Sequence, residues 1–359
     1  MSKLQILVVG AGGVGTMVSV ALERGGKASV TAVLRSNYEK VKQDGFEIES
    51  VDHGKLSAWR PSAGTYQDRI YIRQKLNADR TSKKVTNSVP QADPLKPFDY
   101  IVVTMKNIPD VSNISEIIGP AVTPGHTAIV LMQNGLYMEP PIVEAFPSNV
   151  VLSGASYIGA HERSGHVVHD DHDNFNLGTF HNPALDRVHE RKKLEEFAAV
   201  YNGSGVVEAQ VVNDIVFYRW RKILWNGIFN PMCAITQLDS AAVRRLGGEN
   251  SVIRPGMAEM AAIAKADGYN LGDNIVDEMI DSTPIELAFR PSMLVDVDKG
   301  NPMEAEVILG NAVRLARKRG VATPILDNTY RFLKLTQARL LAARGMITDP
   351  QELPTMDFI

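Results

Sequence analysis

The chain has 359 residues, of which 44% are hydrophobic and 22% charged, an ordinary composition for a globular protein. This length predicts two domains rather than one core. The net charge of −3, and the lack of an apolar run near the roughly 20 residues of a membrane span, argue against nucleic-acid or membrane partners. The single cysteine, Cys233, excludes an intrachain disulfide, and we expect a cytoplasmic protein without a signal peptide.

The first part of the chain alternates apolar strands with helical stretches. The run "LQILVVG" at residues 4–10 is typical of a central parallel strand, and "VGTMVSVALERGG" at 14–26 continues with helical spacing. Apolar runs at 28–35, 98–106 and 126–135 predict further strands of the same sheet. We therefore expect an α/β, Rossmann-type dinucleotide-binding domain over residues 1–212.

The pattern changes in the second half of the chain. The stretch "HVVHDDHDNFNLGTF" at 166–180 predicts a hairpin, and "GSGVVEAQVV" at 203–212 predicts a last strand. Long stretches of helical spacing then predict an all-α C-terminal domain over residues 213–359, ending in a short, loosely held tail. Residues 62–97 are polar and weakly patterned, and we interpret them as an elaborated connection.

A glycine-rich turn follows the first strand. "VVGAGGVGTM" has the spacing G-x-G-x-x-G between a strand and a helix, which is the context of a dinucleotide-binding loop. Gly10 would permit the tight turn, Gly12 the approach of a pyrophosphate, and Gly15 close packing of the helix on the strand. The candidate cofactor-binding loop comprises Gly10, Ala11, Gly12, Gly13, Val14 and Gly15. A glycine turn without a ligand is the alternative.

The end of the second predicted strand indicates which cofactor is bound. An NAD site usually has an acidic residue there, but this chain has "VLRSNYEK". The Arg35 guanidinium can bind a 2′-phosphate and stack on the adenine, and the Ser36 hydroxyl can donate to the same phosphate. This favours NADPH, with an ordinary surface arginine as the alternative.

Three polar residues recur every four positions in "KILWNGIFNP". Lys222, Asn226 and Asn230 would share one helical face among aromatic and aliphatic neighbours. Reduction of a ketone by a nicotinamide cofactor requires a proton donor and polar groups that fix the substrate, and an ammonium can give that proton. The stripe therefore predicts a reduction site, with a solvated helix face as the alternative. Pro231 predicts that the helix kinks or ends there.

Five motifs in order resemble the ketopantoate reductase (2-dehydropantoate 2-reductase) family over nearly the whole chain. They are "GAGGVG", "VVTMKN", "QNG", "KILWNGIFNP" and "SMLVDVDKGNPMEAEVILGN". The resemblance implies a Rossmann domain, an all-helical domain, NADPH, and reduction of ketopantoate to pantoate in pantothenate and coenzyme A biosynthesis. It also implies a small 2-oxo acid as partner, and helical domains of this kind often form homodimers.

The resemblance assigns roles to individual residues. Lys222 would be the catalytic proton donor, and Glu304 would be catalytic while helping to hold cofactor and substrate. Substrate binding is implied for Asn134, Asn226, Asn230 and Ser292, and cofactor contact for Lys106, Asn134, Ala160 and Glu304. Ser240 stands where the family can present a further substrate asparagine, so the exact 2-oxo acid stays open.

Several of these residues have a structural alternative. Lys106 and Asn134 follow apolar strands, where ligands of open α/β sheets bind, but they could be an exposed loop lysine and a turn residue. Glu304 could complete a capping box that Asn301 begins, and Ser292 could be a helix N-cap.

We expect no metal site, because the spacing of His166, His169 and His172 matches no zinc pattern. The favoured activity is transfer of hydride from NADPH to the C2 carbonyl of ketopantoate. The alternatives are a paralogous reductase of another 2-oxo acid or of an imine, and a non-catalytic NADPH-binding redox sensor.

Overall fold

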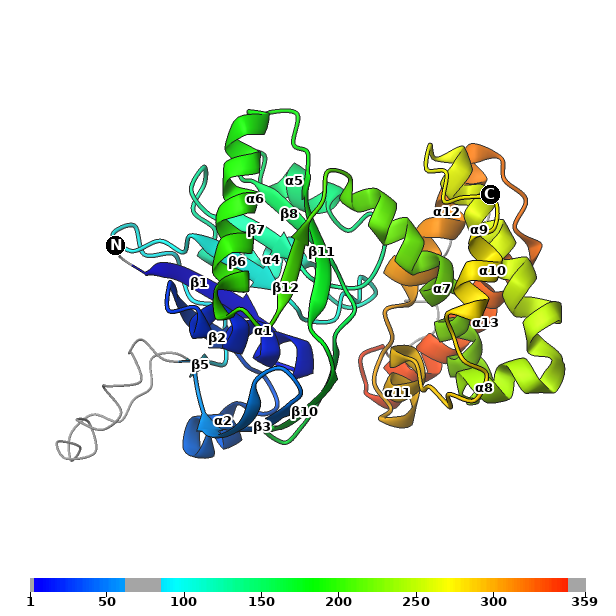
Figure 1. The fold of residues 1–359 in the computed structure, drawn as a ribbon, viewed down its shortest axis with the longest axis horizontal. Helices are drawn as coiled ribbons and strands as arrows, with labels where there is room; N and C mark the ends of the chain where they lie inside the picture. The colour runs from blue at the N-terminus through cyan, green and yellow to red at the C-terminus, as the bar shows by residue number, and fades with distance from the viewer. Residues whose placement is uncertain (1–2, 62–84, 348–359) are drawn as a thin grey trace. The chain divides into compact units, whose positions relative to one another are not determined.

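A computed structural model describes residues 3–61 and 85–347 of the chain, which form two compact units (Figure 1). The first unit comprises Met1–Met105, Ile114–Gln133 and Glu139–Ile215, and the second comprises Lys106–Asn113, Asn134–Met138 and Val216–Ile359. A single division at residues 212/213 thus does not describe two short segments, which lie early in the chain but belong to the second unit. Most of the predicted connection at 62–97, and the whole predicted tail at 348–359, lie outside the described residues.

The first unit is built on a mixed sheet of eight strands in the order β12-β11-β8-β7-β6-β1-β2-β5. These strands are β1 (Leu4–Val9), β2 (Ala28–Val33), β5 (Val85–Thr86), β6 (Tyr100–Val103), β7 (Ala128–Leu131), β8 (Val151–Ser156), β11 (Asn174–Phe180) and β12 (Glu208–Val211). β1 lies between β6 and β2 and is parallel to both, and β11 is antiparallel to β8. The four apolar runs predicted as strands all form strands of this sheet, and the Rossmann-type fold is confirmed.

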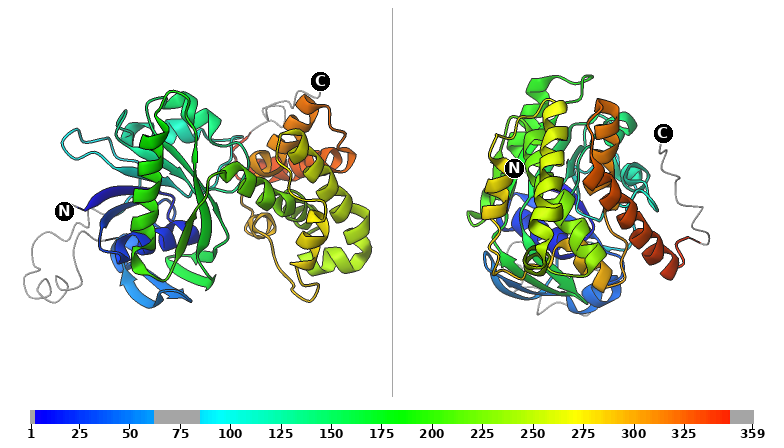
Figure 2. Two further views of the ribbon diagram at one scale, coloured as in Figure 1. Left: turned by 45° about the horizontal axis from the view of Figure 1, so that its top comes forward. Right: turned by 90° about the vertical axis from the view of Figure 1, so that its right-hand side faces the viewer.

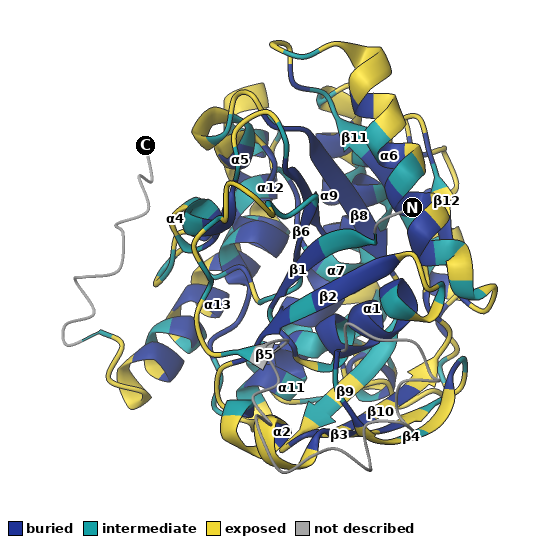
Figure 3. Ribbon diagram, turned by 90° about the vertical axis from the view of Figure 1, so that its left-hand side faces the viewer, coloured by how far each residue is buried: buried dark blue, intermediate teal, exposed yellow. Residues whose placement is uncertain are grey.

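Helices complete the core of the first unit. They are α1 (Gly13–Arg24), α2 (Tyr38–Asp44), α4 (Ile114–Ile118), α5 (Pro140–Ala145) and α6 (Arg187–Tyr201), with short 3₁₀ turns at Gly119–Ala121 and Asn202–Ser204. β6 and β7 are buried along their whole length, as the continuous apolar runs predict. Figure 3 shows β6 in the colour of buried residues. Tyr100, Phe175, Phe197 and Tyr201 fill one core cluster, with ring centroids of neighbouring pairs 4.9–6.1 Å apart.

The predicted hairpin at 166–180 is wrong. β10 (His166–Asp171) belongs to a second sheet of four strands in the order β4-β3-β10-β9, whereas β11 belongs to the eight-stranded sheet. The other strands of the second sheet are β3 (Phe46–Ser50), β4 (Gly54–Trp59) and β9 (Gly159–Arg163). The hairpin is instead β9–β10, because Ser164 and Gly165 both have positive φ and form the two-residue turn.

The histidines of β10 and the residue after it bond to neighbouring polar groups. The His169 ring is buried and its Nδ1 lies 2.7 Å from Ser50 Oγ, while His172 pairs with the Asp52 carboxylate. Among residues 3–61 and 85–347, no group of three or more His, Cys, Asp or Glu residues could hold a metal ion.

The second unit is helical (Figure 2). Its elements are α7 (Ile215–Thr236), α8 (Ser240–Val243), η3 (Arg244–Ile253), α9 (Arg254–Ala266), α10 (Ile275–Asp281), α11 (Ser292–Asp298), η4 (Glu306–Gly310), α12 (Asn311–Arg319) and α13 (Pro324–Ala343). α7 does not end at Pro231 but continues to Thr236, with Cys233 and Ala234 buried in the core. In the part of the chain that the structure describes, no helix is both long and apolar enough to cross a membrane.

Candidate active site

Three glycines of the loop are required by close packing within the first unit. Gly10 has a φ of +103°, and a Cβ there would lie 2.6 Å from the backbone nitrogen of Met105. A Cβ on Gly15 would lie 1.8 Å from the carbonyl oxygen of Gly10. A Cβ on Gly13 would lie 2.2 Å from the carbonyl oxygen of Ala160, on β9. Ala160, predicted to contact the cofactor, thus packs its backbone against the glycine loop.

Gly12 is different, because a Cβ there would meet nothing within 4 Å among the described residues. Gly12 is the N-cap of α1 and has no side chain to cap the helix, and the space beside its Cα is open. Free N–H groups and the helix dipole at such an end favour a phosphate ligand. The residues present therefore fit the pyrophosphate of a dinucleotide, the role that the sequence predicts for Gly12.

The predicted 2′-phosphate ligands, Arg35 and Ser36, are exposed just beyond β2. The next residue, Asn37, is buried, and its Nδ2 donates to the carbonyl oxygen of Ala11 at 3.2 Å. This hydrogen bond ties the end of β2 to the glycine loop. The sequence reasoning overlooked Asn37, although it adjoins the arginine and serine that were singled out.

In the second unit, Lys222 on α7 contacts Asn134, which follows the end of β7. Lys222 Nζ donates to Asn134 Oδ1 at 2.8 Å. Burial and the positive charge of Arg219 lower the pKa of Lys222 to about 8, although the Glu304 carboxylate opposes this shift. A lysine with a pKa near neutral pH is suited to donate a proton. The Asn226 side chain, one turn further along α7, is half-buried and makes no hydrogen bond to another described residue.

Arg219 was not foreseen. It is 3% exposed, and its Nη1 donates to the carbonyl oxygen of Gly135 at 3.1 Å. Arg219 therefore fixes the backbone next to Asn134 while its charge acts on Lys222. Its position three residues before Lys222 on the same helix was the available signal.

Glu304 is 2% exposed and is bonded by the segment Lys106–Asn113. Its Oε1 accepts from the Asn107 backbone N–H at 3.0 Å, and its Oε2 lies 3.6 Å from Lys106 Nζ. Lys106 also donates to Asp296 at 2.8 Å. Desolvation disfavours the charged lysine, but Glu304 and Asp296 outweigh it and raise the pKa of Lys106. The sequence reasoning missed Asp296, whose burial in α11 has no local signal.

The structure rejects the alternative cap roles of Glu304 and Ser292. Glu304 does not close a capping box, because Asn301–Glu304 lie outside any helix and η4 begins at Glu306 with Ala305 as its N-cap. Ser292 is not an N-cap either, because α11 has Pro291 at that position. Lys106, 42% exposed along its side chain, is an ion-paired rather than a free loop lysine.

Asn230 supplies the cap that Pro291 cannot. Its Oδ1 accepts from the Met293 backbone N–H at 3.0 Å and from the Ser292 hydroxyl at 3.2 Å. Asn230 is 2% exposed, so this amide satisfies a buried N–H at the start of α11. The polar stripe of α7 thus divides into Lys222 and Asn226, both half-buried, and Asn230, which bonds to α11.

A Rossmann-type unit with an open glycine loop is the fold typical of proteins that bind a dinucleotide cofactor such as NAD(P) or FAD, and here it is followed by a helical unit. Residues 6–182 match the family described as "Ketopantoate reductase PanE/ApbA", and residues 214–337 match "Ketopantoate reductase PanE/ApbA C terminal". The chain belongs to the ketopantoate reductase family, a family of oxidoreductases, and the resemblance found in the sequence is confirmed.

Individual relatives span the whole chain. "Uncharacterized protein YDL144C" of Saccharomyces cerevisiae is 33% identical over 376 residues, which cover 98% of this chain and 99% of the relative. The crystal structure of 2-dehydropantoate 2-reductase from Methylococcus capsulatus matches with a TM-score of 0.75 at 30% identity. The match covers 94% of this chain and 98% of the Methylococcus chain. The structure of D-mandelate dehydrogenase with NADH and anilino(oxo)acetate shares the fold, with a TM-score of 0.73 at 19% identity. This match covers 94% of this chain and 99% of the dehydrogenase chain.

Two glycine substitutions should separate ligand binding from packing in the loop. Gly12→Ala adds a methyl group in open space, so the melting temperature should stay near wild type. Affinity for a nicotinamide dinucleotide should fall by about tenfold or more, the loss of one charge-assisted hydrogen bond. Gly15→Ala places the methyl group on the Gly10 carbonyl and should cost about 1–3 kcal/mol of stability.

Thermal melts and dinucleotide titrations on the two variants provide the check. A Gly12→Ala protein that binds the dinucleotide as tightly as wild type would show that this helix start is not the phosphate site.

Proposed function

We propose that the protein is an NADPH-dependent reductase of a 2-oxo acid, with ketopantoate as the leading candidate substrate and pantoate as the product. The observation that carries the proposal is the hydrogen bond between Lys222 and Asn134, beside Arg219, with the pKa of Lys222 lowered to about 8. Membership of the ketopantoate reductase family supports the same reaction class. In this proposal the product would feed pantothenate and coenzyme A biosynthesis.

The proposed reaction needs one hydride and one proton. NADPH, when bound, supplies the hydride to the C2 carbonyl carbon. The electron pair of the carbonyl π bond then moves onto oxygen, and the Lys222 ammonium protonates that oxygen to give the alcohol. The Lys222 ammonium donates to the amide oxygen of Asn134 at 2.8 Å, and this hydrogen bond orients the ammonium.

The remaining side chains would bind the substrate. Asn226 offers a half-buried amide one turn from Lys222, and Ser292 offers a hydroxyl at the start of α11. Asn230 would act on the substrate through Ser292, because its amide oxygen accepts a hydrogen bond from the Ser292 hydroxyl. Glu304 would act through Lys106 and the Asn107 N–H, to which its carboxylate bonds. For Asn230 this differs from direct substrate contact, because its amide oxygen already serves α11.

NADPH rather than NADH is proposed from the residues beyond β2. Arg35 and Ser36 are exposed there, and the Asn37–Ala11 hydrogen bond fixes this turn next to the glycine loop. A guanidinium and a hydroxyl at this position suit a 2′-phosphate. D-mandelate dehydrogenase, which shares the fold, was solved with NADH, so the cofactor has to be tested directly.

The proposed activity is tested by measuring the absorbance of NADPH over time, with and without ketopantoate. A loss of absorbance that requires ketopantoate reports oxidation of NADPH. Turnover with ketopantoate supports the proposal, and turnover only with other 2-oxo acids or an imine indicates a paralogous reductase. Acids with an aromatic side chain belong in this panel, because D-mandelate dehydrogenase shares the fold. Binding of NADPH without oxidation by any of them would indicate a redox sensor.

Arg35→Ala should weaken NADPH much more than NADH, because only NADPH carries the 2′-phosphate. Loss of a charge-assisted contact predicts a roughly ten- to hundredfold rise in the dissociation constant for NADPH. Lys40→Ala, which removes a lysine of α2 paired with Asp44, is the matched control and should affect neither cofactor. Equal weakening of both cofactors by Arg35→Ala in fluorescence titrations would remove the assignment.

Lys222→Ala should lower turnover by about 10²–10⁴, the range of a general acid, while NADPH still binds. Lys222→Arg should restore little, because a guanidinium hardly releases its proton. Asn226→Ala should mainly raise KM for the acid, since this amide binds rather than donates a proton to the product. Steady-state kinetics with thermal melts provide the check. A folded Lys222→Ala protein with more than about a tenth of wild-type turnover would contradict the proton-donor role.

The pH dependence follows from the pKa of Lys222. A general acid must be protonated, so kcat/KM for reduction should be flat below the pKa of about 8 and fall above it. The fall should approach about tenfold per pH unit at high pH, as the protonated fraction decreases. Arg219→Gln removes a neighbouring positive charge and should move the descending limb to higher pH. A limb that does not move would show that Lys222 is not the titrating group.

A further inference from the structure

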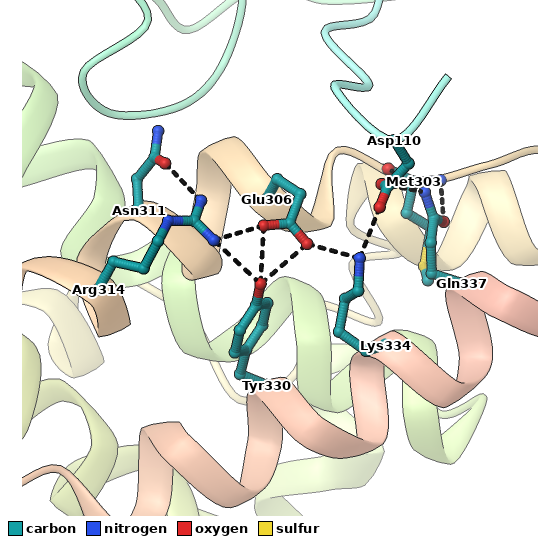
Figure 4. A network of polar contacts seen from close by, with 8 residues as sticks. All are labelled: Asp110, Met303, Glu306, Asn311, Arg314, Tyr330, Lys334 and Gln337. Atoms are coloured by element: carbon teal, nitrogen blue, oxygen red, sulfur yellow. Dashed lines mark hydrogen bonds and ion pairs between the residues drawn. The ribbon is translucent and has the colours of Figure 1, made fainter. Parts of the chain in front are cut away.

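A network of polar side chains in the second unit lies outside the residues assigned to catalysis (Figure 4). It contains two carboxylates, Asp110 and Glu306, and two cations, Lys334 and Arg314, so its charges balance. Lys334 lies between the carboxylates, with its Nζ 2.5 Å from Asp110 Oδ1 and 2.7 Å from Glu306 Oε1. Tyr330 donates its hydroxyl to Glu306.

The network holds the segment Lys106–Asn113. This segment has no helix or strand, and its internal backbone hydrogen bonds run from Val111 and Ser112 to Ile108. The Asp110 side chain is 1% exposed, and both of its oxygens accept from α13, from Lys334 and from Gln337 Nε2 at 3.2 Å. The position of the segment therefore depends on these side-chain contacts.

The same helix holds the residue before Glu304. Gln337 is fully buried, and its Oε1 accepts from the Met303 backbone N–H at 2.8 Å. Its Nε2 donates to the Met303 carbonyl oxygen at 3.0 Å as well as to Asp110. One side chain of α13 thus binds both the segment that carries Lys106 and Asn107 and the chain that leads into Glu304.

We propose that Lys334 and Gln337 are positioning residues, which set Lys106 and Asn107 against the Glu304 carboxylate by holding Asp110 and Met303. Neither residue is assigned a contact with substrate or cofactor. The inference rests on the proposed function for its effect on turnover, but the placement of the segment is independent of that function.

The contacts on each side of Glu304 show why small shifts would matter. Asn107 N–H to Glu304 Oε1 is 3.0 Å, and Lys106 Nζ to Glu304 Oε2 is already 3.6 Å. A hydrogen bond is lost once donor and acceptor separate beyond about 3.5 Å, and the attraction between two charges falls as their distance grows. A loosened Asp110 would therefore leave a buried carboxylate with weaker partners, and Glu304 also acts electrostatically on Lys222.

A double-mutant cycle between Lys334 and Glu304 tests the inference. Lys334→Met should lower kcat/KM about tenfold in the wild-type background but less than about twofold when Glu304→Gln is already present, since coupled sites are non-additive. Asp110→Asn, which keeps the shape of the side chain, is the second variant should Lys334→Met fail to fold. Asp327→Asn is the matched control. It removes an ion pair with Arg317 from the same helix, α13, and neither residue of that pair contacts the segment Lys106–Asn113 in an interaction given for the described residues.

Amide hydrogen exchange provides a readout that does not depend on activity. Lys334→Met and Asp110→Asn should speed exchange of the Asn107 N–H by about tenfold or more, whereas Asp327→Asn should not. Equal kinetic losses in both backgrounds, the same kinetic loss in Asp327→Asn, or unchanged exchange at Asn107 would overturn the inference. Wild-type protein that reduces no 2-oxo acid would instead refute the proposed function, and the exchange result alone would then decide the placement.

Discussion

Glu304 is 2% exposed, so its carboxylate has almost no contact with water. Protein groups must therefore supply the hydrogen bonds and opposite charge that stabilise it. Its partners are the Lys106 ammonium and the Asn107 N–H, which come from a segment far away in sequence. This requirement draws Lys106–Asn113 into the helical unit. The same carboxylate acts on Lys222 against Arg219, so the balance of charge around Glu304 also helps to determine how readily Lys222 holds its proton.

Features encoded within one stretch of sequence could be predicted. The strand that precedes the glycine loop is a continuous apolar run, and Gly10, Gly13 and Gly15 stand where a Cβ would collide with backbone or side-chain atoms. The hairpin failed because apolar alternation identifies strands but not their partners. Two strands separated by a short connection, β10 and β11, enter different sheets, and the turn with two positive φ angles lies at Ser164 and Gly165.

The site was predictable only in part, because most of its contacts join distant residues. The helical spacing correctly placed Lys222 and Asn226 on one helix, and Asn134 contacts that lysine. No local pattern shows that Asn230 would cap α11 or that Asp296 would pair with a lysine 190 positions away. The capping-box interpretation of Glu304 failed for the same reason, because its carboxylate bonds to Asn107 and Lys106, which are distant in sequence, instead of to Asn301.

Membership of the family does not identify the substrate, because 2-oxo acids share the reacting group and differ only in their side chains. Every 2-oxo acid presents the same carbonyl and carboxylate, and in the proposed function Lys222 acts on the carbonyl oxygen that all of them share. Ser240, at the position where a further substrate amide would stand, is buried and donates to the carbonyl oxygen of Leu287, while its N–H bonds to Phe289. Because that hydroxyl and N–H already bond to the chain's own backbone, we expect other residues to recognise the side chain of the proposed substrate.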